Sequence, residues 1–524
     1  MRRTGEQDQA PGRRHRRGVR PADGRRLARV GLSIAAGALA TVLAAAAHAQ
    51  VPARPATPAE LEQQVTVLQQ QLRTVLEQQK GLTDTLNQLQ QQLHSQAAAQ
   101  TVAAPSAADG SAPPSAKEAD ASTAQRLLDR YQDGIVIWQT PNDAKVPFLL
   151  RFNLNTQVRY LNTTSGDDTF TDHLGVVRGV NLRNDITVNR SMFILGGYIF
   201  DPRLRYSSTV WTSAGSASIV VAGNIGWQFS KAFTLTGGYT GVPGSRSLVN
   251  TFPFYQSTDR SMADNFFRPG FTQGLWANGD LPHGLHYLAF VGNGLNTLNI
   301  SATKIDENLV LSGSAWWEPL GDYGPPGKSR NMYDDYYASP DLRIRLGSSF
   351  TRAREDRFSD LDQSSPENTS IHNSDGVLTF ATGAFAPGVT VDNATYRMWA
   401  IDGGLKRGGW SVNGQYYFRW VDDFKADGPI PIKAMFDQGF EVSVASFILP
   451  RKLMAYGRGS MVFGQFRDSW EAGAGVKWYP VPTERMWLSA EVMRVVNVPY
   501  GGAFTPYTAG LTAWVPMVQA VLAM

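Results

Sequence analysis

The chain has 524 residues, of which 42% are hydrophobic and 18% are charged, with no cysteine and a formal net charge of +4. The lack of cysteine excludes a disulfide scaffold, a thiolate metal site and a cysteine nucleophile. The positive charge resides in residues 1–49, which hold 10 Arg and 3 acidic residues and leave 39 basic and 42 acidic residues in the remainder, so nucleic-acid binding is not indicated.

The N-terminal segment has the pattern of an export signal. Three arginines, Arg25, Arg26 and Arg29, precede an apolar run over 30–47, and Ala-His-Ala follows at 47–49. A basic start, an apolar centre and small residues before the cleavage site predict a signal peptide at 1–49. The apolar run has 18 residues, so an uncleaved membrane anchor is the alternative.

Residues 50–95 predict a periplasmic coiled coil. Apolar residues recur at alternating spacings of four and three, which is the a/d pattern of a heptad repeat, and a helix with this narrow stripe needs a partner helix. The seam consists of Leu61, Val65, Leu68, Leu72, Val75, Gln79, Leu82, Leu86, Leu89 and Leu93. Two or three strands both fit this seam, and a lone helix packing on the rest of the chain is the alternative.

Residues 96–125 are rich in Ala, Pro and Ser and predict a linker. All the aromatic residues follow it, because none lies before residue 131. Beyond the linker no apolar run reaches the length of a membrane-spanning helix.

Residues 126–524 contain many segments that alternate with period two. In 410–420, one face carries Trp410, Val412, Gly414, Tyr416, Phe418 and Trp420, and the other carries Ser411, Asn413, Gln415, Tyr417 and Arg419. Alternation with aromatic ends is typical of transmembrane β-strands. The predicted strands are 148–160, 186–199, 203–211, 217–229, 233–241, 271–280, 285–293, 307–317, 341–350, 394–404, 410–421, 438–448, 453–463, 470–479, 486–494 and 506–517.

The connections between these segments alternate in length. Short turns, such as those at Asp201-Pro202, Pro319-Leu320-Gly321 and Arg407-Gly408-Gly409, alternate with long stretches at 162–185, 242–270 and 351–392. This predicts an all-β fold, a 16-stranded antiparallel transmembrane β-barrel preceded by the α-helical coiled coil. A barrel of this size keeps an aqueous lumen, so we expect a pore.

Four short groups of residues follow one another along the barrel region. They are Asn189-Arg190 with Phe200-Asp201-Pro202, Leu235-Thr236-Gly237-Gly238-Tyr239 with Val242-Pro243, Asp259-Arg260-Ser261 with Arg268-Pro269, and Gly279-Asp280-Leu281 with Phe290-Val291-Gly292-Asn293-Gly294. The order resembles that of the phosphate-selective porin O and P family, over roughly residues 125–500. The resemblance implies a trimer, an inward-folding third loop and diffusion of phosphate-like anions.

Basic side chains on the inner face are the candidates for anion passage. Alternation places inward Arg151, Arg159, Arg343, Arg345, Arg419, Arg458 and Lys477, together with Glu441, Glu471 and Glu491. The stretch from 242 to 270 is the candidate constriction loop, with Arg246, Arg260 and Arg268 at the narrowest point. In the alternative interpretation, these arginines pair with acidic residues and only pin the loop.

Enzymatic interpretations find little support. Gly327-Lys328-Ser329 resembles the end of a phosphate-binding loop, but Asp322 stands where the first glycine is required. His283 and His286 lie in a predicted turn without a third metal ligand nearby.

We therefore expect an outer-membrane porin of a Gram-negative-type envelope, not an enzyme, that forms a water-filled channel for passive diffusion of small hydrophilic solutes and prefers anions such as phosphate. The expected partners are permeant anions, outer-membrane lipids and further copies of the chain in a homotrimer, with contact to the cell wall through the coiled coil. No cofactor, metal or nucleic acid is expected. The alternative is a structural outer-membrane anchor whose coiled coil tethers the envelope, with conduction secondary.

Overall fold

The computed structural model describes residues 131–524 except 142, 214–217, 250, 326–331, 362 and 503. The predicted signal peptide, the coiled-coil seam from Leu61 to Leu93 and the linker lie outside the described residues. In the part of the chain that is described, no helix is long and apolar enough to cross a membrane.

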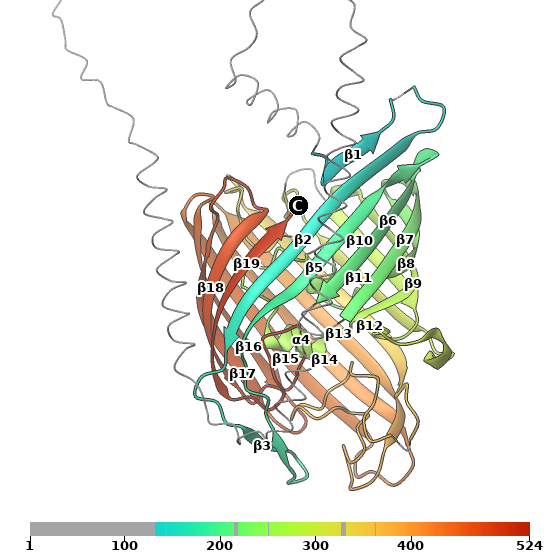
Figure 1. Cartoon of the computed structure of the whole chain (residues 1–524), viewed down its shortest axis with the longest axis vertical. Helices are drawn as coiled ribbons and strands as arrows, with labels where there is room; N and C mark the ends of the chain where they lie inside the picture. Colours follow the sequence, from blue (N-terminus) through green and yellow to red (C-terminus); the bar gives the residue numbers. More distant parts are fainter. Residues whose placement is uncertain are drawn as a thin grey trace, which may run out of the picture. The chain divides into compact units, whose positions relative to one another are not determined.

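Sixteen of the described strands form one closed antiparallel barrel (Figure 1). Each strand pairs with the next in sequence, and the last pairs with the first through Gln519 and Arg159. The strands are β2 (Phe148–Asn162), β5 (Asn184–Ile199), β6 (Asp201–Ser213), β7 (Ser218–Ser230), β8 (Phe233–Gly241), β9 (Phe271–Leu281), β10 (Leu285–Gly292), β11 (Val310–Trp317), β12 (Arg343–Asp356), β13 (Val391–Arg407), β14 (Trp410–Ala426), β15 (Ala434–Leu449), β16 (Leu453–Phe463), β17 (Ser469–Trp478), β18 (Met486–Val496) and β19 (Ala513–Ala523). Closure leaves each barrel strand with a neighbour on both sides, which a membrane interior requires.

Alternation along the strands separates an apolar outside from a polar inside. In β12, Leu346 and Phe350 are 52% and 49% exposed, whereas Arg345 and Ser349 are buried. The same alternation holds in β14, where Trp410 and Val412 are exposed while Ser411 and Asn413 are buried. The fold class predicted for the barrel is therefore confirmed.

Short elements lie outside the barrel ladder. Strand β1 (Ile135–Gln139) pairs with β2 at Leu149–Phe152, beyond the point where β19 ends opposite Asn155. The others are the hairpin β3 (Thr169–Thr171) and β4 (Val177–Gly179), the helix α4 (Met262–Phe267) and the 3-10 turns η2 (Arg246–Leu248), η3 (Pro282–Gly284) and η4 (Ala302–Lys304). Most of the long connections gather at the barrel end opposite the C-terminus (Figure 1), called here the loop end. The short connections and one long one, between β11 and β12, lie at the other end, called the turn end.

The last strand differs from its prediction. It spans Ala513–Ala523 rather than 506–517, and Pro516 lies within it, opposite Val492. Residues 506–512 instead complete the preceding loop, where Tyr507 and Leu511 are buried. The prediction was wrong because both faces of this segment are apolar, so alternation does not define where the strand begins.

One connection predicted as a short turn is long. The chain between β11 and β12 runs from Glu318 to Leu342 instead of turning at 319–321, and its described parts enter the barrel from the turn end. The Lys406 ammonium donates to the carbonyls of Tyr323 at 2.8 Å and Met332 at 2.7 Å, and Asn413 donates to the carbonyl of Tyr333 at 2.9 Å. Because these donors belong to the inner face, the segment occupies the lumen.

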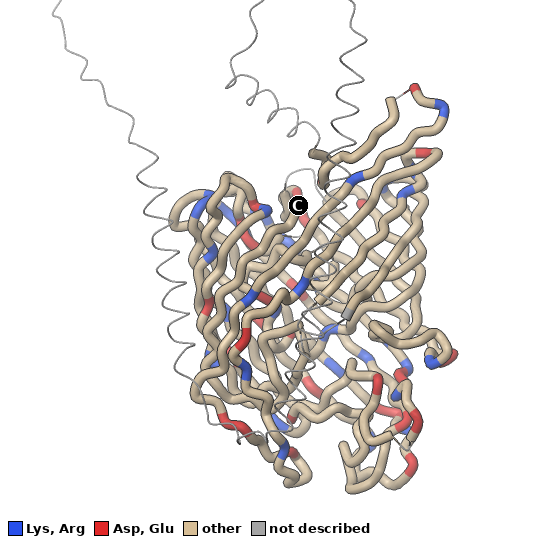
Figure 2. The backbone as a smooth tube through the Cα atoms, in the orientation of Figure 1, with Lys and Arg blue, Asp and Glu red and all other residues tan. Residues whose placement is uncertain are grey.

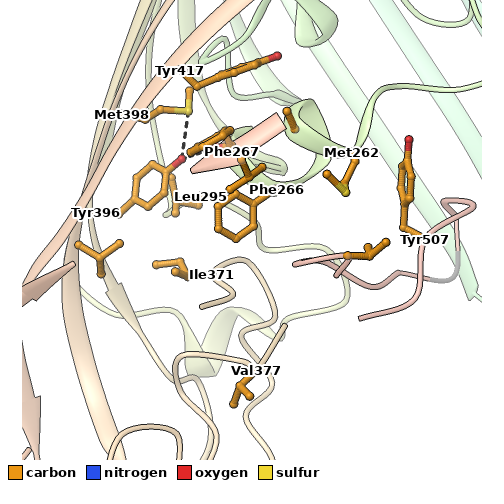
Figure 3. Packing of buried hydrophobic residues seen from close by; sticks show 14 of the residues in the cluster. Met262, Phe266, Phe267, Leu295, Ile371, Val377, Tyr396, Met398, Tyr417 and Tyr507 are labelled. Atoms are coloured by element: carbon orange, nitrogen blue, oxygen red, sulfur yellow. Dashed lines mark hydrogen bonds between the residues drawn. The ribbon is translucent and has the colours of Figure 1, made fainter. Parts of the chain in front are cut away.

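The loops that enter the barrel build an apolar core inside it (Figure 3). Met262, Phe266 and Phe267 of α4 belong to this core together with the wall residues Tyr396 and Met398, and the Tyr396 hydroxyl donates to the Phe267 carbonyl. The Phe267 ring also stacks on Tyr417 at 5.0 Å between centroids. Burial of this aromatic surface holds the helix against one side of the lumen.

Candidate functional site

The loop from Val242 to Gly270 lies inside the barrel, because it contacts strands around much of the wall. Gln519 of β19 donates to the Thr258 carbonyl at 3.0 Å, and Gln256 donates to the Ser411 hydroxyl of β14 at 2.9 Å. Between them, Arg458 of β16 donates to the Asp259 carbonyl at 2.8 Å. Only a segment within the lumen can reach all three strands, so this loop narrows the barrel.

Asp259 is the centre of the first charge cluster on this loop. Its carboxylate accepts a hydrogen bond from Arg159 at 2.8 Å, lies 3.8 Å from Arg190 and also accepts from the Arg260 amide at 2.9 Å. Burial alone would raise the pKa of Asp259, but the arginines Arg190, Arg159 and Arg260 together lower it below its ordinary value. Asp259 is therefore an anion that anchors the loop to β2.

Asp264 forms a second cluster at the start of α4. Ser261 caps the helix by accepting from the Asp264 amide at 3.0 Å, and the Asp264 carboxylate accepts from Ser247 at 2.7 Å. The side-chain nitrogens of Arg260 and Arg268 lie 3.6 and 3.7 Å from the same carboxylate. Two arginines thus share one acid, and this carboxylate orders both side chains.

Arg246 is the third arginine predicted for the constriction. Its guanidinium lies over the rings of Tyr333 at 4.1 Å and Tyr323 at 5.1 Å, and 3.9 Å from Asp402. It faces the segment that enters from the turn end, whereas Arg260 and Arg268 meet at Asp264. All three loop arginines therefore have the acidic neighbours of the pinning interpretation, and their part in the ion path stays a prediction.

The predicted wall residues fall into two groups. Five lie in the barrel interior with buried side chains: Arg159, Arg345, Arg419, Arg458 and Lys477. Arg345 pairs with Asp402 at 3.0 Å, Arg419 with Asp437 at 2.7 Å, and Arg458 with Glu491. Lys477 donates to the Tyr255 carbonyl of the loop.

The other two predicted wall residues lie at the turn end. Arg151 donates to the Gln132 carbonyl beside β1 at 2.8 Å, and Arg343 donates to the Leu320 carbonyl. Neither contacts the loop at 242–270, so they stand apart from the narrow region. The inward acids Glu441 and Glu471 do contact it, by accepting hydrogen bonds from Ser261 and from the Met262 amide.

Three cavities follow one another through the described interior. The loop-end cavity has a volume of about 330 Å³. Its lining consists of Arg190, Met192, Trp211, Phe252, Arg260, Asn265, Arg268, Gly270, Phe271, Asn296, Leu298, Asn299, Thr369, Ser370, Tyr500, Gly501, Gly502, Phe504 and Thr505. The turn-end cavity has about 360 Å³ and includes Asp322, Asp334, Asp335, Arg343 and Lys406. Between them lies a narrow cavity of about 30 Å³ beside Arg260, Tyr333 and Glu441, with room for about two water molecules.

The two larger cavities differ in charge. Of the described residues that line the loop-end cavity, three are arginines and none is acidic. The turn-end cavity combines three aspartates with one arginine and one lysine. Over the barrel as a whole, both signs are distributed along the wall (Figure 2). A cationic region is therefore confined to the loop-end side of the narrow cavity.

Sequence reasoning did not include Arg190 among the site residues. Arg190 pairs with Gln157 while Val188 pairs with the next residue, Val158, so Asn189 forms a β-bulge and both Asn189 and Arg190 are buried. A bulge shifts the alternation by one residue, and alternation alone therefore cannot place the side chains around it. The turn-end segment was missed as well, although some 20 residues between the predicted turn and the next predicted strand were a signal that it is not a tight turn.

No family model and no curated protein matches the chain. Solved structures resemble it at low identity. An outer membrane protein, OmpT of Vibrio cholerae, aligns at 10% identity over 73% of this chain and 99% of its own, with a TM-score of 0.45. An anion-selective porin from Comamonas acidovorans aligns at 10% identity over 72% and 100%, with a TM-score of 0.40.

The outer membrane channel DcaP of Acinetobacter baumannii aligns at 9% identity over 74% of this chain and 100% of its own, with a TM-score of 0.39. Likeness of this degree concerns the fold alone, and the barrel assignment rests on the strand pairing of this chain itself. The resemblance to the phosphate-selective porins therefore stays an expectation.

Proposed function

We propose that this protein is an outer-membrane porin that allows passive diffusion of small hydrophilic solutes and prefers anions, phosphate among them. The observation that carries the proposal is the loop-end cavity, which borders the narrow cavity and is lined by three arginines and no acid among its described residues. Charges beside a narrow, low-dielectric passage concentrate their field on a passing ion. The arginines beside the narrow cavity therefore favour the passage of anions over cations.

The barrel supports an outer-membrane location. A closed antiparallel barrel with an apolar outer face satisfies its backbone without water, and its polar inner face can line an aqueous path. Several apolar side chains on the outer face are each more than half exposed, namely Ile219, Val221 and Ile225 of β7 and Leu275 of β9. Such a surface is suited to lipid.

The narrow cavity sets an expectation for the size of the current. Permeation through a space for about two waters requires small solutes or movement of the side chains around it. We therefore expect a small single-channel conductance for a barrel of sixteen strands. The signal peptide, the homotrimer and contact of the coiled coil with the cell wall are parts of the same proposal.

The test is the reversal potential of the purified protein in planar bilayers under a KCl gradient, repeated with added phosphate. An anion-selective conductance that phosphate reduces would support the proposal. A cation-selective or phosphate-insensitive pore would refute the anion preference. A folded, inserted protein without conductance would refute the channel and leave the barrel as an anchor.

A further inference from the structure

We infer that the loop-end cavity is a binding site for a small aromatic carboxylate, which makes it a specificity site of the channel. The inference rests on the proposed function and narrows its solute class. It starts from the cavity's volume of about 330 Å³, which lies within the range of small-molecule sites. A benzene ring with one carboxylate fits such a space.

The first argument is that the cavity is aromatic as well as cationic. Five rings line it beside the arginines: Trp211, Phe252, Phe271, Tyr500 and Phe504. The Trp211 ring lies 5.1 Å from Phe504 and 5.9 Å from Phe271. Inorganic phosphate has no apolar surface to place against these rings, whereas an aromatic ligand can stack or pack edgewise on them.

The second argument concerns the arginine at the junction of the rings and the charges. The Arg190 guanidinium lies 5.2 Å from the Phe252 ring centroid and 6.0 Å from that of Phe504. Its nearest carboxylate is Asp259, at 3.8 Å, and that acid already accepts a shorter hydrogen bond from Arg159. A second carboxylate would give Arg190 a charge-assisted partner while the ligand's ring meets Phe252 or Phe504.

The third argument is that several polar atoms of this lining lack a partner. The indole nitrogen of Trp211, Nε of Arg268 and the Ser370 hydroxyl are buried and make no hydrogen bond in the described structure. Nε of Arg268 lies 3.7 Å from the Asp264 carboxylate, too far for a good hydrogen bond. These atoms have almost no accessible surface, so a small shift of their side chains is needed before a ligand in the cavity can accept from them, and a ligand with acceptor oxygens would favour that shift.

A single ligand must match both the aromatic rings and the hydrogen-bond donors of the cavity. A simple carboxylate such as acetate would satisfy the donors but would leave the aromatic surface uncovered, and a neutral aromatic alcohol would do the reverse. An aromatic carboxylate meets both demands, so we expect it to bind about fivefold to tenfold more tightly than either.

The experiment is a calorimetric titration of the detergent-solubilised protein with benzoate, acetate and benzyl alcohol. The variants are Arg268→Gln, which removes a cation, and Phe252→Leu, which removes a ring but keeps apolar volume. Matched controls remove an arginine and an aromatic ring from the turn-end cavity, which Tyr337 also lines, as Arg343→Gln and Tyr337→Leu. Arg268→Lys is a second cavity variant that keeps the charge and loses the planar fork.

We expect each cavity variant to weaken benzoate binding by about fivefold to tenfold, the effect of one such contact, and the controls to leave it within about twofold. Equal affinity for benzoate and acetate would overturn the inference, as would equal losses in the cavity and control variants. If Arg268→Gln fails to fold, Arg268→Lys and Phe252→Leu decide the matter.

The titration needs no current, so its failure differs from failure of the proposed function. An anion-selective channel that binds benzoate no better than acetate would refute this inference but not the proposed function. A protein that binds benzoate but does not conduct would sink the channel. In the channel itself, benzoate should reduce the chloride current at lower concentrations than acetate.

Discussion

The anchoring of the constriction loop by Asp259 makes a sharp prediction for Asp259→Asn. Asp259 and Arg159 are buried, and their ion pair at 2.8 Å joins the loop to β2. Neutralising the acid leaves Arg159 and Arg190 facing each other without a carboxylate. Breaking a buried ion pair from one side costs about 3 kcal/mol or more, because the remaining charge is left uncompensated.

The expected effect is an increase of about a hundredfold in opening of the loop, since every 1.4 kcal/mol is a factor of ten. Because the chain has no cysteine, Ala263→Cys provides a single reporter at a fully buried position of α4. Its alkylation by a water-soluble thiol reagent measures how often the loop leaves the wall. Asp259→Asn also removes one negative charge from the lumen, so chloride selectivity should rise in bilayer recordings.

The matched control is Asp201→Asn in the same Ala263→Cys background. Asp201 also pairs with an arginine, Arg203 at 2.8 Å, but at the turn end Arg203 is exposed and Asp201 is only partly buried. Water screens such a pair, so the alkylation rate should stay unchanged. Alkylation of the Asp259→Asn protein at the control rate, with unchanged selectivity, would refute the view that this ion pair anchors the loop.

Three further predictions concern other parts of the chain. Phe267→Ala removes a fully buried ring that stacks on Tyr417, and should lower the unfolding free energy by about 3 to 5 kcal/mol, measured by urea unfolding, whereas Phe229→Ala on the exposed outer face should change it far less in detergent. His372 lies in the loop between β12 and β13, where burial and then Arg419 lower its pKa to about 3 from 6.5. The unfolded segment therefore binds the proton more readily, so this loop loses about 1.4 kcal/mol of stability per pH unit below about 6.5. The protection factors of the amides in 363–390, which correct the exchange rates for their intrinsic pH dependence, should be lower at pH 5 than at pH 7.5. His372→Gln should remove most of that difference, and an equal pH response of the protection factors in both proteins would contradict the prediction. Deletion of 61–93 should convert the predicted trimer to smaller species in analytical ultracentrifugation. An unchanged number of chains per assembly would mean that the barrel, and not the coiled coil, holds the oligomer together.

The alternation of side chains was sufficient to predict the barrel. In β14, the residues from Trp410 to Trp420 alternate in sequence as they do in burial, because adjacent strand residues must point to opposite faces. The same rule placed Arg345, Arg419 and Arg458 in the interior. It does not place Arg190, where a bulge displaces the alternation, and it gave the wrong bounds for β19, where both faces are largely apolar.

Apart from the last strand and the bulge at Asn189, the sequence by itself determined where the barrel strands lie and which side chains point inward, because these follow from a period of two between neighbouring residues. Only the tertiary structure decided which arginines meet which acids, as Arg159 and Asp259 lie 100 residues apart and meet inside the lumen. Likewise, only the folded chain brings Arg190, Phe252 and Phe504 around one cavity. Loops have no repeating pattern that specifies where they end in space, and their positions are set by packing and charge pairing within the finished barrel.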